Sequence, residues 1–146
     1  MSGKKWPPPG FPLVEGRYQL TSEWSIDLYD RFARRIEDAD LVLWRPGITL
    51  WIAAWNNDKH QSQADRLKSL ISGASPERFD ERKEQVNGNI RWSYRLIDTN
   101  DDGNVQSLNW FGFNDEGHLQ IAVYFDDIAD EHLARLLVDS VVDHPR

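Results

Sequence analysis

Short runs in which apolar residues alternate with polar ones fill most of this chain, and such runs are typical of β-strands. Runs 41–45 and 48–55 are apolar at almost every position, and Pro46 and Gly47 stand between them. Because a Pro-Gly pair favours a turn, these runs predict a hairpin of two strands that are buried on both faces.

Within the second strand of this hairpin, the alternation places Trp51 and Trp55 on one face. The other face then carries Ile48, Leu50 and Ile52. We expect one face to meet helices, and the other to be covered by the N-terminal segment or left as an apolar patch.

A meander follows in the second half of the chain. Runs 82–86 and 89–97 flank Asn87-Gly88, the residue pair most typical of a two-residue hairpin turn. Strands are predicted again at 105–113 and 118–125. In 89–97 the alternation places Ile90, Trp92, Tyr94 and Leu96 on one face of the strand. The other face then carries Arg91, Ser93 and Arg95.

Two segments have helical spacing. Segment 58–72 has an apolar stripe and is followed by Gly73, a residue typical of helix C-terminal caps. Segment 127–142 has a second stripe, formed by Leu133, Leu136, Leu137 and Val141. The stretch 75–81 predicts a short additional turn of helix, and 14–20 predicts a first strand. Segment 24–38 fits a helix or a strand, and the pattern does not separate them.

This order predicts an α+β fold in which an antiparallel sheet of hairpins is covered by two helices. Residues 1–12 are expected to be an extended, proline-rich and poorly ordered arm, and residues 13–146 a single domain. The order of strands, inserted helix and C-terminal helix resembles the PsbP-like fold, also seen in DcrB-type bacterial proteins, and the run 41–51 resembles uncharacterised bacterial proteins of this size. The resemblance implies a binding or accessory role and carries no site residue.

Composition narrows the classes of function. Seven tryptophans and no cysteine mean that large rings stabilise the core and that disulfides, thiolate nucleophiles and thiolate zinc sites are excluded. The net charge of −7 is concentrated in residues 98–146, which hold 11 acidic and 2 basic residues. Such a region repels nucleic acids and attracts basic surfaces.

We see no signal peptide and no membrane-spanning stretch, so we expect a cytoplasmic protein with no membrane partner.

The sharpest motif is Asp98-Thr99-Asn100-Asp101-Asp102-Gly103-Asn104-Val105, which matches the first eight positions of an EF-hand calcium loop. The candidate ligands are Asp98, Asn100, Asp102 and Asn104. Position 12 is Asn109 where that loop has a glutamate, and both flanks read as strands. A polar hairpin turn is the alternative interpretation.

No nucleophile motif, phosphate-binding loop or ligand-spaced histidine pair occurs in the sequence, so we predict no catalytic residue and no cofactor other than calcium. The sequence predicts a non-enzymatic domain that binds a protein partner, as an adaptor, accessory or toxin-neutralising protein. Trp51, Trp55, Arg91 and Arg95 are expected to form its contact patch, because tryptophan and arginine are frequent interface anchors. The acidic region would steer a basic partner. A calcium-responsive domain and a small-molecule-binding domain or enzyme are the alternatives.

Overall fold

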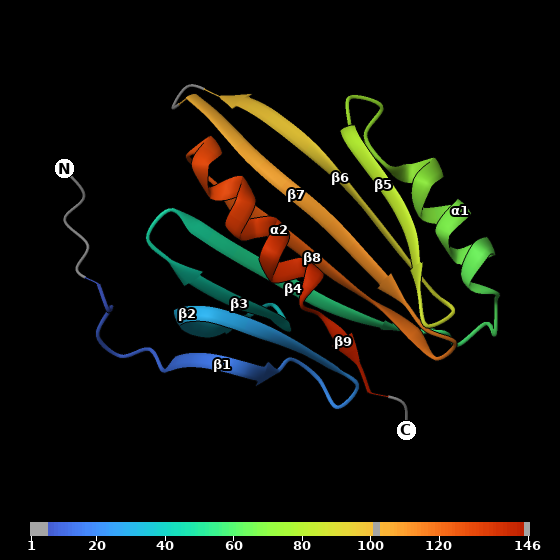
Figure 1. Cartoon of the computed structure of the whole chain (residues 1–146), viewed down its shortest axis with the longest axis horizontal. Coiled ribbons are helices and arrows are strands. Elements are labelled where there is room, and N and C mark those ends of the chain that lie inside the picture. Colours follow the sequence, from blue (N-terminus) through green and yellow to red (C-terminus); the bar gives the residue numbers. More distant parts are fainter. Residues whose placement is uncertain (1–5, 101–102, 145–146) are drawn as a thin grey trace.

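The computed structural model describes residues 6–100 and 103–144. Within them nine strands form one antiparallel sheet in the order β1-β2-β3-β4-β8-β7-β6-β5, and β9 pairs with the start of β2 (Figure 1). The elements are β1 (Leu13–Gln19), β2 (Trp24–Glu37), β3 (Asp40–Arg45), β4 (Ile48–Asn56), α1 (Gln63–Gly73), β5 (Phe79–Val86), β6 (Asn89–Asn100), β7 (Gly103–Phe113), β8 (Gly117–Phe125), the 3₁₀ turn η1 (Ile128–Asp130), α2 (Glu131–Asp139) and β9 (Val142–Asp143). The fold is α+β and consists mostly of sheet.

Segment 24–38, left open between helix and strand, is the strand β2. Leu28 and Phe32 are spaced by four residues, and this spacing keeps side chains on one face in a strand as well as in a helix. The reversal into β3 is made by Asp38 and Ala39, which both have positive φ (50° and 72°). β2 pairs with β1 on one side and with β3 on the other, so the backbone groups of these strands are satisfied. A helix in this segment could not pair with either neighbour.

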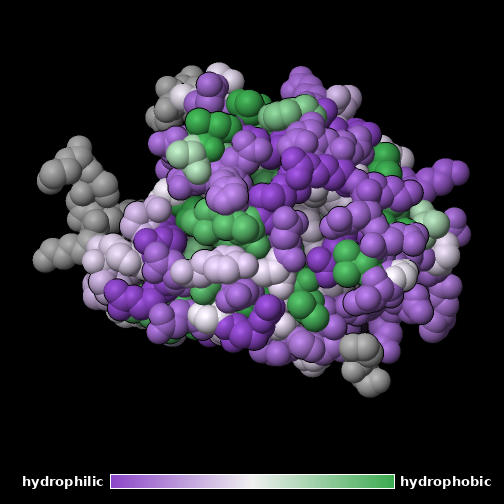
Figure 2. All heavy atoms as spheres, viewed as in Figure 1, coloured by the Kyte–Doolittle hydropathy of each residue, from purple (hydrophilic) through white to green (hydrophobic). Residues whose placement is uncertain are grey.

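Helix α2 lies in front of the sheet in Figure 1, on the face that carries Ile48, Leu50 and Ile52. The buried residues of α2 are Ala134, Leu137 and Val138. Leu136, predicted in the packing stripe, is 39 % exposed, because the helix is rotated toward Ala134 and Val138. The outer surface on this side is mostly hydrophilic with small apolar patches (Figure 2).

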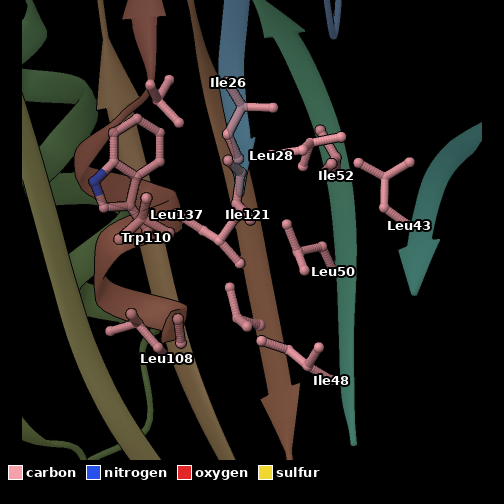
Figure 3. Packing of buried hydrophobic residues seen from close by; sticks show 14 of the residues in the cluster. Ile26, Leu28, Leu43, Ile48, Leu50, Ile52, Leu108, Trp110, Ile121 and Leu137 are labelled. Atoms are coloured by element: carbon pink, nitrogen blue, oxygen red, sulfur yellow. The ribbon is translucent and has the colours of Figure 1, made fainter. Parts of the chain in front are cut away.

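Beneath α2 lies the larger core of the protein. Figure 3 shows Leu137 of α2 directed toward Trp110 and Ile121, with Leu50 and Ile52 of the neighbouring strand beyond. Ile121 and Leu50 are fully buried and Trp110 is 2 % exposed. Burial of such side chains contributes about 1.5–3 kcal/mol each, so this core is the main source of stability.

Helix α1 packs on the opposite face of the sheet, over β6. Its Leu67 lies in a second core with Trp92 and Phe111. The helix begins at Gln63 rather than residue 58, because the Ser62 hydroxyl caps it by accepting from Asp65 N at 3.0 Å. Gly73 is the last helical residue rather than the cap.

The structure differs from prediction at two other helical segments. The stretch 75–81 forms a turn that leads into β5 at Phe79, so the expected extra helical turn is wrong. The C-terminal helix ends at Asp139, and Val142 and Asp143 form strand β9 against Trp24 and Ser25. The pairing partner that draws these residues out of the helix is distant in sequence, and local spacing does not report it.

The described part of the proline-rich arm contacts the sheet. Arg34 N donates to Pro12 O at 3.1 Å, and the Phe11 ring meets the Trp44 ring edge-on with centroids 5.0 Å apart. Residues 1–5 lie outside the described residues. Among the described helices, none is both long and apolar enough to cross a membrane.

Candidate functional site: an aromatic face of the sheet

Four rings on β3, β4 and β8 share one face of the sheet, and we call them the aromatic face: Trp44, Trp51, Trp55 and Tyr124. Thr49 pairs with Trp44 on one side and with Tyr124 on the other, which places all three on that face. Trp55 is 54 % exposed and Tyr124 is 38 % exposed, while Trp44 and Trp51 are half-buried. Exposure of this much aromatic surface on neighbouring strands is a feature of binding surfaces.

The aromatic face is exposed because of where the helices pack. Helix α2 contacts β2, β7 and β8 from the opposite side, and α1 contacts β6. The alternating residues of β4 show the result, since Ile52 is 4 % exposed whereas Trp55 is mostly accessible. The sequence-based alternation of β4 is therefore confirmed.

A guanidinium group is held between two rings of this face. The Arg35 Cζ atom lies 4.7 Å from the Trp44 ring centroid and 5.7 Å from that of Trp51. The Glu37 carboxylate forms an ion pair with Arg35 Nη2 at 2.8 Å, and this pair offsets the positive charge of Arg35. Stacking of this kind orients both rings and leaves a surface that combines apolar area with a fixed polar group.

Trp55 continues into a row of rings that crosses the sheet. It stacks on His118 with centroids 6.1 Å apart and an angle of 19° between the planes. His118 in turn lies 5.3 Å from Phe113 of the second core. Burial, and then the charge of Arg66, lower the pKa of His118 to about 4. The imidazole is therefore neutral at pH 7, and the row is uncharged.

The lowered pKa of His118 predicts how stability depends on pH. Its pKa is about 4 in the folded protein and 6.5 in the unfolded chain, so between these values the unfolded state binds more protons. We expect the free energy of unfolding to fall by about 1–3 kcal/mol as pH decreases through this window, and to be unaffected by His118 above it. Urea melts from pH 7.5 to 4 measure this, and His118→Phe should flatten the curve. An equal slope in this variant would contradict the assignment.

The predicted contact patch is not one surface. Trp51 and Trp55 lie on the aromatic face, whereas Arg91 and Arg95 lie on the face covered by α2. Arg95 is 3 % exposed and pairs with Glu131 at 2.9 Å, and Arg91 Nη2 donates to Val141 O at 2.6 Å. The sequence correctly placed Arg91 and Arg95 on the face of β6 that does not carry Trp92. It did not show which face of β6 continues the face of β4 with Trp51 and Trp55, because β7 and β8 lie between these strands.

The predicted calcium loop is the tip of the β6–β7 hairpin. Asp98 pairs with Val105 and Thr99 with Asn104, so Asp98 and Asn104 belong to opposite faces of the hairpin. The Thr99 hydroxyl donates to Asn104 Oδ1 at 2.8 Å. Asp102 lies outside the described residues, as does the side chain of Asn100. Within the described part of the chain, no group of three or more acidic, histidine or cysteine side chains could hold a metal. Calcium binding stays a prediction.

Sequence reasoning did not find Arg35 or Tyr124 as part of a surface. Tyr124 could have been found from the alternation of β8, in which His118, Gln120, Ala122 and Tyr124 share one face. Arg35 carried no such signal, because its place beside Trp44 follows from the pairing of β2 with β3.

Comparison of the sequence with protein-family models finds no match, and no curated protein matches it either. The structure is similar to a crystal structure from Bacteroides thetaiotaomicron, with a TM-score of 0.66 and 8 % sequence identity. The alignment covers 91 % of this chain and 50 % of that one, so the chain spans about half the length of the protein it matches. At this identity, the likeness shows a shared fold and nothing of function.

Proposed function

We propose that this protein is a non-enzymatic binding domain of the cytoplasm, and that its aromatic face captures a basic segment of a protein partner. The observation that carries the proposal is the exposure of Trp55 and Tyr124 beside the half-buried Trp44 and Trp51. Tryptophan and tyrosine are the residues that most often dominate binding energy at interfaces. The resemblance to the PsbP-like fold, which rests on the order of strands, inserted helix and C-terminal helix, implies an accessory role.

Charge indicates the chemistry of the partner. Tyr124 lies near the end of β8, and the segment after it contains Asp126, Asp127 and Asp130. Asp126 N donates to Gly47 O, and Asp130 Oδ2 lies next to Gly47, so this acidic segment lies beside the turn between β3 and β4, at one end of the aromatic face. Acidic groups at the margin of an apolar surface accelerate the approach of a cationic partner, and salt weakens this effect.

The proposal is tested with a short peptide of alternating lysine and leucine, and with its glutamate–leucine counterpart as a control. We expect the lysine peptide to quench the exposed tryptophan fluorescence, and Trp55→Ala to weaken binding by at least about tenfold. Ile97→Ala is the matched control, because Ile97 is 47 % exposed but lies on the opposite face. Equal affinities in the two variants would refute the proposal.

A double variant separates binding from folding. Trp51→Ala combined with Trp55→Ala should abolish peptide binding while the protein keeps its far-ultraviolet circular dichroism and a cooperative melt. If the double variant is unfolded, the rings are core residues and the aromatic face is not a binding surface.

A further inference from the structure

A pocket on the other face of the sheet has no role in the binding proposed above. It lies between α2 and strands β5 and β6, and its volume is about 160 Å³. In Figure 2 the surface between α2 and β5 is hollowed and rimmed by hydrophilic residues. We call it the arginine pocket, and its lining residues are Arg82, Lys83, Glu84, Arg91, Trp92, Ser93, Trp110, Arg135 and Asp139.

The strand register determines which side chains face this pocket. Arg82 pairs with Ser93 and Glu84 pairs with Arg91, and Ser93 and Arg91 both bond to the C-terminal part of the chain around α2. Lys83 pairs with Trp92, so its side chain belongs to the opposite face. The cations that face the pocket are therefore Arg82 and Arg91 from the strands and Arg135 from α2.

Arg135 has a hydrogen-bonding group that the described residues leave unused. Its Nη1 donates to Ser93 Oγ at 2.9 Å, and its side chain is 15 % exposed. Its Nη2 is buried and forms an ion pair with Asp80 Oδ2 at 3.7 Å, which is too long for a hydrogen bond, so this group has no hydrogen-bond acceptor in the described chain. A buried guanidinium N–H without an acceptor is costly, and an oxyanion would remove that cost.

The carboxylates around the pocket are shared among its arginines. Asp80 bonds to Arg82 and pairs with Arg135 Nη2 at 3.7 Å. Glu84 acts on Arg91, and Asp139 acts on both Arg91 and Arg135. Burial lowers the pKa of both Arg91 and Arg135, and the charge of Arg82 lowers that of Arg135 further. These guanidinium groups are therefore poorly solvated, and an anion held inside the pocket would stabilise their charged form.

We propose that the arginine pocket binds the oxyanion group of a small molecule, a phosphate or a carboxylate, against Arg135 and Arg82. The pocket has the volume of about five water molecules, which suits such a group. A second, more open pocket of about 480 Å³ shares Arg82 and Arg135 and continues along Ile128, Ala129, Glu131 and His132. The organic part of the ligand lies there, with Ile128 as its apolar contact.

Titration with inorganic phosphate and with acetate, each at constant ionic strength against chloride, tests this site. The readout is the ¹H–¹⁵N signal of the Arg135 Nε–Hε group together with calorimetry. We expect saturable shifts with at least one of the two anions. A response to phosphate alone assigns a phosphoryl ligand, and a response to acetate alone assigns a carboxylate. No saturable shift, or an equal response to chloride, would overturn the proposal.

Variants locate the binding. Arg135→Lys keeps the charge but removes the guanidinium fork, and we expect about tenfold weaker binding of the responding anion. Arg31→Gln is the control, because it removes one positive charge from an exposed position in the middle of β2. If Arg135→Lys binds as the wild type does, or if Arg31→Gln weakens binding equally, the anion is attracted by overall charge and the proposed site is wrong.

Discussion

Replacing Trp92 by alanine is expected to destabilise the protein by about 3–5 kcal/mol, since removal of a fully buried large ring loses its transfer free energy and leaves a cavity. Trp92 is 1 % exposed and stacks on Phe111 with centroids 5.0 Å apart. Its indole Nε1 donates to Glu81 Oε2 at 2.7 Å, so the variant also loses this hydrogen bond, while Glu81 keeps its ion pair with Arg78 at 3.3 Å. The loss should lower the melting midpoint by about 10 °C or more.

The position of Trp92 also determines which part of the protein loses stability first in the alanine variant. Leu67 of α1 belongs to the same small core as Trp92, while α2 belongs to the other core. Hydrogen exchange should therefore accelerate in α1 before α2. Trp55→Ala removes the same side chain from an exposed site where it stacks on His118, and its effect should stay within about 1.5 kcal/mol. Equal losses in the two variants would contradict the distinction between buried and exposed rings.

Replacing Gly117 by alanine is expected to cost about 3 kcal/mol or more, because the added methyl group meets backbone rather than a movable side chain. A Cβ atom at this position would lie 2.0 Å from Trp55 O and 3.3 Å from Asn56 Cα. Gly117 pairs with Asn56, and its carbonyl accepts from Arg66 Nη1 at 2.8 Å. Relief of the clash would separate β4 from β8 and disturb this tether to α1.

Gly73→Ala is the matched control for Gly117→Ala. Gly73 ends α1, and an added Cβ meets nothing within 4 Å. We expect this variant to be neutral or slightly stabilising in a urea melt, since alanine favours helix. The close approach at Gly117 would be disproved by a melt in which both variants match the wild type. Because Gly117 fixes the strand next to Trp55, Gly117→Ala should also weaken capture of the lysine–leucine peptide.

Most strands were predictable because their signals are local. The turn pairs Pro46-Gly47 and Asn87-Gly88 end one strand and start the next, and Gly47 and Gly88 have φ of 84° and 80°. Side-chain alternation then assigned the two faces of β4 and of β6. Burial confirms the faces of β4, and in β6 Trp92 packs with α1 whereas Arg95 pairs with Glu131 of α2. By contrast, the start of α1 was placed too early, since Asn57 holds the preceding loop by bonds to Gln61.

The candidate site was predicted only in part. The alternation grouped Trp51 with Trp55, and the structure keeps them together on the exposed face. It could not relate them to Arg91 and Arg95, because alternation defines the faces of one strand and gives no information on another strand several positions away in the sheet. Arg35 and the arginine pocket were missed for the same reason.

The sequence alone determined where this chain extends and turns, because the sterics of glycine, proline and alternating side chains act over a few residues. It also determined that large rings, rather than disulfides, would stabilise the domain. Only the tertiary structure decided that α1 and α2 pack on opposite faces, which leaves Trp55 in solvent and encloses Arg135. Those outcomes depend on contacts between residues far apart in the chain, and only the packing of the whole sheet brings such residues together.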